Sequence, residues 1–244
     1  MGFKAQKVKE EIILWIKDWF EKNGPSSPAV IGISGGKDST IVAALCVAAL
    51  GKERVFGLIL PNGAYRDIEI ANAVIKHLGI KSALLDIKPS YDALLNGLGK
   101  SVEISHQTRI NLAPRLRMSA LYAAAQSLAG RVANTSNLSE AYVGYSTRYG
   151  DGAGDFSPLL TLTMTEAVAI GHALGLPAEF VDKVPEDGLS GRTDEENLGF
   201  TYAMLDNYIR TGICPDAAIK AKIDTLHKIN RFKQLPMPRF EYKP

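Results

Sequence analysis

Short apolar runs alternate with longer segments of helical periodicity through the first part of the chain. The short runs predict β-strands over residues 29–34, 54–60, 81–86 and 131–134. Apolar positions at helical spacing predict helices over residues 8–22, 39–50, 67–78, 91–98 and 102–129. We expect Pro114 to disturb the last of these helices, because proline removes a helical hydrogen bond.

This alternation predicts the α/β class, with a single doubly wound parallel sheet. Strands that are apolar throughout are typical of a parallel sheet with helices on both faces. Nothing in the sequence marks a break into two domains, so we expect residues 1–244 to form one domain. Ligands of such sheets bind at the carboxyl ends of the strands.

The second half of the chain is less regular. Thr163-Met164-Thr165-Glu166 has the pattern of a capping box, so we expect a helix from there to about Gly175. A further helix is expected over residues 195–209. We expect the tail, residues 230–244, to be extended and pinned to the surface. The loops 62–67 and 186–196 are charged or contain glycine, and we expect them to be mobile without ligand.

The segment with the clearest chemistry is the turn that follows the first predicted strand. Gly35 and Gly36 allow backbone N–H groups to close around an anion, and Ser34 and Ser39 add hydroxyl donors. Asp38 lies in the middle of this phosphate cradle, where a bare carboxylate would repel phosphate. A divalent cation that bridges the carboxylate and the phosphate would resolve the conflict.

Two familiar phosphate-binding motifs do not fit this turn. A Walker A loop has Ser or Thr after Gly-Lys, whereas Asp38 follows Lys37 here. The G-x-G-x-x-G pattern of dinucleotide-binding folds is absent as well. The plain alternative is an ordinary strand-to-helix turn with two glycines.

Composition and charge limit the other possibilities. The formal net charge of +2 gives no basic footprint for nucleic acid, so we expect no nucleic acid partner. The longest apolar run has ten residues, too few to span a bilayer, and we expect no membrane segment. Cys46 and Cys214 lie far apart, which fits a reducing cytoplasm, and the four histidines show no zinc spacing.

Four further motifs follow the phosphate loop. Arg115 and Arg117 are two positions apart on a helix and point in different directions, so we expect one to contact ligand and the other to be structural. The segment Thr135-Ser136-Asn137-Leu138-Ser139-Glu140 follows a strand and supplies a hydroxyl and a carboxylate. Residues 148–155, Arg-Tyr-Gly-Asp-Gly-Ala-Gly-Asp, form a glycine-spaced loop, and a charged loop lies at residues 187–196.

Together these motifs resemble the ammonia-dependent NAD synthetases, a family of N-type ATP pyrophosphatases with an adenine nucleotide alpha hydrolase-like, Rossmann-like fold. The resemblance runs from about Val30 to about Tyr208. It implies that the nicotinate carboxylate of deamido-NAD attacks the α-phosphorus of ATP, which gives an acyl adenylate and pyrophosphate. Ammonia then forms the amide, which yields NAD and AMP. It also implies a homodimer, which the apolar faces at residues 12–20 and 121–128 support weakly.

The resemblance assigns roles to particular residues. It implies catalytic roles for Lys37, Asp38 and Asp151, and magnesium ligation by Asp38 and Glu140. It implies deamido-NAD contacts from Arg115, Arg148 and Asp155. The residues that it implies for ATP are Gly32, Ile33, Ser34, Gly35, Gly36, Lys37, Asp38, Ser39 and Thr135. Four of these residues also have a plain alternative: a helix N-terminal acid (Glu140), a surface ion pair (Arg115), a turn cap (Asp155) or a strand end (Thr135).

The sequence departs from the family pattern in several places. Arg148 stands where lysine is common, Met164 where a lysine often reaches ATP, and Glu186 where Ser or Thr is usual. Lys37, Lys183 or Arg192 are candidates to supply the missing charge. Near the C-terminus, Arg231-Phe232-Lys233 occupies the region of a family His-Lys pair.

Two rival functions remain at the level of sequence. Another adenylating ATP pyrophosphatase, either a different amidating synthetase or a tRNA thiolase, would use the same phosphate loop. A thiolase would be expected to have reactive cysteines and a basic face. A non-catalytic nucleotide-binding protein of the universal stress type would share the sheet, but an acid within the phosphate loop is not needed for ATP retention alone.

Overall fold

The computed structural model describes residues 2–64, 68–182 and 193–243. Within these residues, four parallel strands form one sheet in the order β3-β2-β1-β4. The strands are β1 (Ala29–Gly32), β2 (Val55–Ile59), β3 (Lys81–Leu84) and β4 (Arg131–Val132). Because all four run in the same direction, their carboxyl ends lie along one edge.

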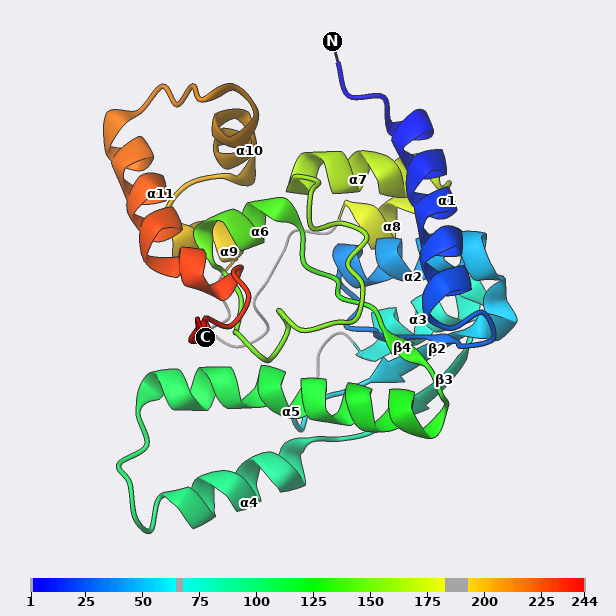
Figure 1. The fold of residues 1–244 in the computed structure, drawn as a ribbon, viewed down its shortest axis with the longest axis horizontal. Coiled ribbons are helices and arrows are strands. Elements are labelled where there is room, and N and C mark those ends of the chain that lie inside the picture. Colours follow the sequence, from blue (N-terminus) through cyan, green and yellow to red (C-terminus); the bar gives the residue numbers. More distant parts are fainter. Residues whose placement is uncertain (1, 65–67, 183–192, 244) are drawn as a thin grey trace.

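Helices cover both faces of the sheet (Figure 1). One face carries α1, α2, α3 and α7, the other carries α4 and α5, and the helices α6 and α9 to α11 form a group beside the sheet. Their bounds are α1 (Ala5–Asn23), α2 (Lys37–Leu50), α3 (Ile68–Leu78), α4 (Lys88–Leu98), α5 (His106–Ser127), α6 (Leu138–Val143), α7 (Met164–Ala173), α8 (Ala178–Val181), α9 (Asp194–Leu198), α10 (Tyr202–Thr211) and α11 (Ala217–Asn230). Two 3-10 turns complete the list, η1 (Lys52–Arg54) and η2 (Arg231–Lys233).

The core explains this arrangement. The first part of α2 is buried on every side, and Ile41 and Leu45 pack there against Ile31 of β1. On the opposite face, Ala125 of α5 packs against Val30 and Val132. Apolar side chains on both faces of β1 thus pack against helices. This confirms the doubly wound α/β class predicted from the sequence.

Several predicted boundaries are wrong for identifiable reasons. Helix α5 begins only after Ser105, whose hydroxyl accepts the Thr108 N–H, and it continues through Pro114 without ending. The helix expected over residues 195–209 is two helices, because Gly199 takes a left-handed conformation (φ +75°) between them. Helix α11 is an element that we did not predict. The expected capping box at Thr163 is present.

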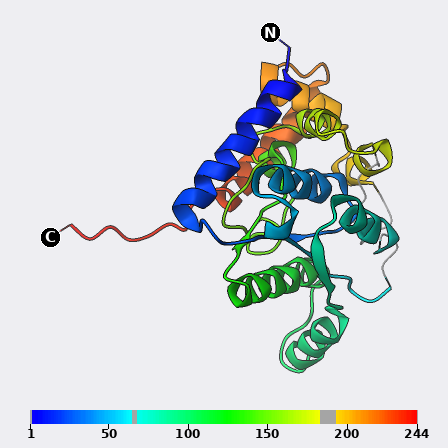
Figure 2. The same cartoon turned by 90° about the vertical axis from the view of Figure 1, so that its right-hand side faces the viewer.

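The C-terminal tail also differs from expectation. After η2, residues 234–243 form no regular element. Residues 234–237 line a cavity beside the loop after α6, whereas Figure 2 shows the end of the chain stretching away from the rest. Phe240 and Tyr242 are 89% and 77% exposed. A tail pinned to the surface is therefore wrong beyond residue 237. The expectations for the loops 62–67 and 186–196 rest largely on residues outside the described ranges.

None of the helices in the described ranges combines the length and the apolar character that crossing a membrane requires.

The N-terminal helix anchors the loop between α6 and α7 through aromatic contacts. Phe156 is 5% exposed and stacks on Trp19 of α1 at 4.9 Å between ring centroids. Phe20 meets the same ring edge-on at 5.2 Å. The predicted amphipathic helix at residues 8–22 thus fixes residues next to Asp155.

Replacing Phe156 with alanine should lower the free energy of unfolding by about 3–5 kcal/mol, because it removes a buried ring and leaves a cavity. Equilibrium urea denaturation measures this change. The matched control is Phe240→Ala, in the exposed tail, which should change the stability by no more than about 0.5 kcal/mol. Equal effects of the two substitutions would contradict the anchoring role.

Candidate functional site

The phosphate loop joins β1 to α2 at the carboxyl edge of the sheet. Gly35 has a positive φ of 75°, which lets the turn close, and Gly36 is the N-cap of α2. The Gly36 N–H donates to Ser34 Oγ (3.2 Å), and Ser39 Oγ donates to the Gly36 carbonyl (3.0 Å). These bonds hold the turn in shape. The N-terminal N–H groups of a fourteen-residue helix then point toward the site, which suits an anion.

The expected ATP residues therefore lie together. Gly32 ends β1, Ile33 through Gly36 form the turn, and Lys37, Asp38 and Ser39 form the first turn of α2. Thr135 follows β4, the strand next to β1 in the sheet. The topology thus places Thr135 at the same edge as the turn, as the sequence predicted.

Asp38 and Glu140 come together beside this loop. Burial raises the pKa of Asp38 to about 6, although Lys37 and a hydrogen bond from Asn137 act in the opposite direction. Burial also raises the pKa of Glu140 well above its usual value, and the negative charge of Asp38 adds to the effect. Asp194, at the start of α9, raises both values further. Burial and mutual repulsion thus disfavour the charged forms of both carboxyl groups, unless a positive charge joins them.

Two neighbouring buried carboxylates of this kind are stabilised by a divalent cation. Magnesium prefers one or two protein carboxylates together with phosphate oxygens, and two carboxylates beside an anion-binding turn match that preference. Among residues 2–64, 68–182 and 193–243, no group of three or more His, Cys, Asp and Glu side chains could hold a metal ion by itself. The residues fit a cation that is shared with bound phosphate.

Asn137 is a residue of this site whose role the sequence analysis missed. It is fully buried and caps α6: its Oδ1 accepts the Glu140 N–H (3.1 Å). Its Nδ2 donates to Oδ1 of Asp38 (3.3 Å). The signal was present in the sequence, because Asn three positions before Glu is a common start of a helix.

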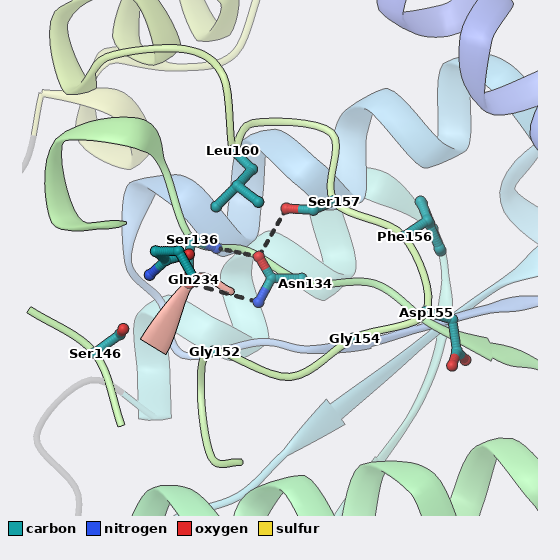
Figure 3. A pocket seen from close by; sticks show the side chains of 10 residues that line it. All are labelled: Asn134, Ser136, Ser146, Gly152, Gly154, Asp155, Phe156, Ser157, Leu160 and Gln234. Carbon is teal, nitrogen blue, oxygen red and sulfur yellow. Dashed lines mark hydrogen bonds between the residues drawn. The ribbon is translucent and has the colours of Figure 1, made fainter. Parts of the chain in front are cut away.

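A second part of the site is the loop between α6 and α7. Asn134, just after β4, organises it: Nδ2 donates to the carbonyls of Asp151 (2.8 Å) and Ala153 (3.2 Å), and Oδ1 accepts from Ser157 Oγ (2.8 Å). Figure 3 shows Asn134 between Ser136 and Ser157 in the wall of a cavity of about 270 Å³. The cavity is lined by Asn134, Ser136, Ser146, Gly152, Gly154, Asp155, Phe156, Ser157, Leu160 and Gln234.

The two expected acids of this loop make bonds within the protein. Oδ1 of Asp151 accepts the Thr147 N–H (2.7 Å), which closes the loop on itself. Asp155 accepts the Val132 N–H (2.8 Å) and the Tyr122 hydroxyl (3.3 Å), so that its carboxylate points away from Asn134 (Figure 3). Burial and the charge of Asp155 raise the pKa of Tyr122 to about 12.

The two arginines point to different partners, as their spacing on the helix predicts. The structure gives Arg117 a structural contact, and the ligand contact expected of Arg115 stays a prediction. Arg117 Nε donates to the Leu60 carbonyl (2.9 Å), which ties α5 to the end of β2. Arg115 is exposed and its Nε reaches the Arg148 carbonyl (3.4 Å) on the loop after α6. The guanidinium of Arg148 lies over the rings of Tyr149 (5.0 Å) and Phe232 (5.4 Å).

The departures from the family pattern have partial structural explanations. Met164 is 3% exposed and packs in the cluster of Leu198, Leu205 and Ile223, as an apolar side chain should. Lys233 donates to the carbonyls of Gly144 (2.7 Å) and Ser146 (3.0 Å) and so ties the C-terminal turn to the loop after α6. Lys183, Glu186 and Arg192 lie outside the described residues.

Fold and site together define an α/β nucleotide-binding protein with an anion-binding turn and two carboxylates at the carboxyl edge of its sheet. A family model described as NAD synthase matches residues 8–237. The chain therefore belongs to the NAD synthase family, a family of ATP-using ligases. This confirms at family level the activity predicted from the sequence, the ATP-dependent amidation of deamido-NAD.

Individual proteins support this membership. The NH3-dependent NAD+ synthetase of Pyrococcus furiosus is 39% identical over 201 residues, which cover 82% of this chain and 77% of that protein. The solved NH3-dependent NAD synthetase of Campylobacter jejuni is 30% identical with a TM-score of 0.80, covering 99% of this chain and 100% of that one. An NMN synthetase from Francisella tularensis is 32% identical with a TM-score of 0.90, at coverages of 99% and 100%.

Gly154→Ala should destabilise the protein by about 1–3 kcal/mol, since close packing leaves no room for a methyl group. A Cβ at this position would lie 2.6 Å from Asn134 Cβ and 2.7 Å from its backbone nitrogen. Gly152→Ala in the same loop is the control, because the nearest atom to its Cβ is 3.4 Å away. Thermal unfolding compares the two, and equal midpoints would show that Asn134 does not fix the loop.

Proposed function

We propose that this chain forms NAD from deamido-NAD, ammonia and ATP by way of an acyl adenylate. The observation that carries the proposal is the meeting of the anion-binding turn with Asp38 and Glu140, next to a separate cavity. The turn suits the pyrophosphate part of ATP, and the loop after α6 suits the second substrate. Both lie at the carboxyl edge, where such sheets bind ligands.

The chemistry needs no side-chain nucleophile. A carboxylate oxygen of the substrate attacks the α-phosphorus, the α–β bond breaks, and pyrophosphate leaves. Ammonia then attacks the activated carbonyl carbon, AMP leaves, and a proton is lost from nitrogen. The protein contributes by aligning the two substrates and by stabilising the negative charge that develops on phosphate.

The residues divide between these tasks. Residues 32–39 and Thr135 bind ATP, and Lys37 adds positive charge at the pyrophosphate. Asp38 and Glu140 hold magnesium, which neutralises phosphate charge when bound. Asp151 shapes the loop that receives the second substrate.

Three further residues contact that substrate: Arg115, Arg148 and Asp155. Asp155 can take part because a carboxylate retains acceptor sites beyond its bonds to Val132 and Tyr122.

Both cysteines, Cys46 and Cys214, are free thiols, which supports a reducing cytoplasmic location.

A second candidate substrate is nicotinate mononucleotide, which would give NMN. The observation in its favour is the TM-score of 0.90 against the Francisella NMN synthetase, which the chain matches over its whole length. The chemistry at the carboxylate is identical for the two substrates. They differ in the AMP half of the dinucleotide.

An assay with ATP, magnesium and ammonium distinguishes these functions. We expect AMP to form only when a nicotinate nucleotide is added, with a higher kcat/KM for the dinucleotide than for the mononucleotide. A preference for the mononucleotide would establish the second candidate. AMP formation with neither substrate would contradict both candidates.

Asp38→Asn supplies the control for this assay. The substitution keeps the size of the side chain but removes the charge, so turnover should fall below detection while thermal unfolding shows a folded protein. Turnover that survives in this variant would refute the metal role of Asp38.

We also propose that the chain forms a homodimer through β3 and α4. The apolar faces from which we expected a dimer are partly used within the chain: Ile16 and Phe20 are buried, and Leu121 packs against the sheet. Leu14, Trp15 and Leu128 of these faces are exposed. A larger group of exposed apolar side chains lies over residues 84–102. These are Leu84, Leu85, Leu94, Leu98 and Val102, each 47% to 54% exposed. Exposed apolar residues in such number favour a protein contact.

The double substitution Leu94→Glu with Leu98→Glu should convert the dimer to a monomer, because it places two charges on one face of α4. Sedimentation velocity at micromolar concentration measures the change. Ile213→Glu, which alters a residue that is 65% exposed outside this surface, should leave the dimer intact. A wild-type chain that sediments as a monomer would contradict the proposal.

A further inference from the structure

Asn137 connects the two carboxylates of the proposed metal site. Its side-chain amide donates to Oδ1 of Asp38, at the start of α2, and its carbonyl oxygen accepts the backbone N–H of Glu140. The residue has no solvent exposure. One buried side chain therefore contacts one acid directly and fixes the backbone of the other.

The turn that carries Asn137 is itself held rigidly. Ser139 donates its hydroxyl to Asp206 of α10 and accepts the Met164 N–H at 2.9 Å. The other oxygen of Asp206 accepts the Thr165 N–H at 2.8 Å. Ser139 and Asp206 are 0% and 5% exposed, so a shift of this turn would break buried hydrogen bonds.

The amide of Asn137 has one further acceptor nearby. Nδ2 lies 3.9 Å from Sδ of Met164, and because a thioether accepts weakly, the carboxylate of Asp38 is the better acceptor of the two. An amide donor at this place occupies one site on Oδ1 and leaves the remaining acceptor sites of the carboxylate for a cation. Buried carboxylates that bind metal are commonly oriented by such a hydrogen bond.

We propose that Asn137 is a positioning residue for magnesium: it holds Asp38 and Glu140 at the separation that the cation requires. This inference rests on the proposed function, in which these two acids bind the metal. The capping role alone does not need asparagine, since serine caps helices comparably well. The hydrogen bond to Asp38 does need asparagine, because the side-chain amide is its donor.

Asn137→Ser separates the two roles. Serine keeps an acceptor for the Glu140 N–H, but its shorter side chain cannot donate to Asp38. We expect the dissociation constant for Mg²⁺ to rise about 10- to 100-fold, the usual effect of removing a hydrogen bond to a metal ligand. Isothermal titration calorimetry measures it in the presence of an ATP analogue with a methylene group between the α and β phosphorus atoms, so no turnover occurs.

Asn230→Ser is the matched control. Asn230 donates to the carbonyls of Val143 (3.0 Å), at the other end of α6, and Leu226 (3.1 Å), so these side-chain bonds lie away from Asp38. This variant should bind Mg²⁺ as the wild type does. Affinity for the analogue in metal-free buffer should be the same in all three proteins, because only the metal-dependent part of binding changes. Thermal unfolding verifies that each variant is folded. Asn137→Thr repeats the comparison with a larger side chain than serine, which fills more of the buried space that asparagine occupies.

The outcomes are distinguishable. Unchanged Mg²⁺ affinity in Asn137→Ser, with lost affinity in Asp38→Asn, would overturn the role of Asn137 and leave the metal site in place. Equal weakening in the Asn137 and Asn230 variants would also overturn it, since it would reflect general loosening of α6. Unchanged affinity in Asp38→Asn would refute the metal site and with it the role of Asn137.

Discussion

Two carboxylates held close together in a partly buried place are unfavourable unless something of opposite charge joins them. Asp38 and Glu140 are in this situation: burial raises the pKa of both, and the charge of Asp38 further raises the pKa of Glu140. They lie beside a turn whose backbone is arranged for an anion. In the proposed site, a cation neutralises the two acids and the phosphates of ATP neutralise the cation. The rest of the structure keeps the two acids and the turn in place.

The parallel sheet supplies most of that placement. Since β1 and β4 are neighbours and run in the same direction, the turn after one and the segment after the other meet at a single edge. Asn137 then links the two acids, and Asn134 fixes the adjoining loop. Phe156 secures the same loop to the aromatic residues of α1. Groups from separate parts of the chain are thus positioned by one core, as alignment of two substrates requires.

Much of the fold could be predicted from the sequence, because the information is local. The apolar runs at residues 29–34 and 54–60 and the capping box at Thr163 each depend on near neighbours. The break at Gly199 was missed because helical periodicity continues across it, and only the left-handed conformation reveals the end of α9. The Thr193–Glu196 capping box marked the true start and was overlooked.

The residues of the candidate site likewise divide into those that a local sequence pattern reveals and those that it does not. The phosphate loop is continuous in sequence, so its residues could be named at once, and family resemblance supplied Glu140 and Arg115. Asn137 contacts Asp38 across 99 positions of sequence, and no local pattern reports such a bond. The apolar residues that are actually exposed, such as Leu98, could not be separated by sequence from those like Leu121 that pack on the sheet. Three-dimensional packing decides which apolar face remains open.

The central claim is that the site joins a substrate carboxylate to the α-phosphorus of ATP. Deamido-NAD labelled with ¹⁸O in both carboxylate oxygens tests it most directly, with mass spectrometry of the products after turnover with ammonia. One labelled oxygen should appear in AMP and one should remain in the amide of NAD, with none in pyrophosphate. Label in pyrophosphate, or AMP that carries no label, would contradict the claim.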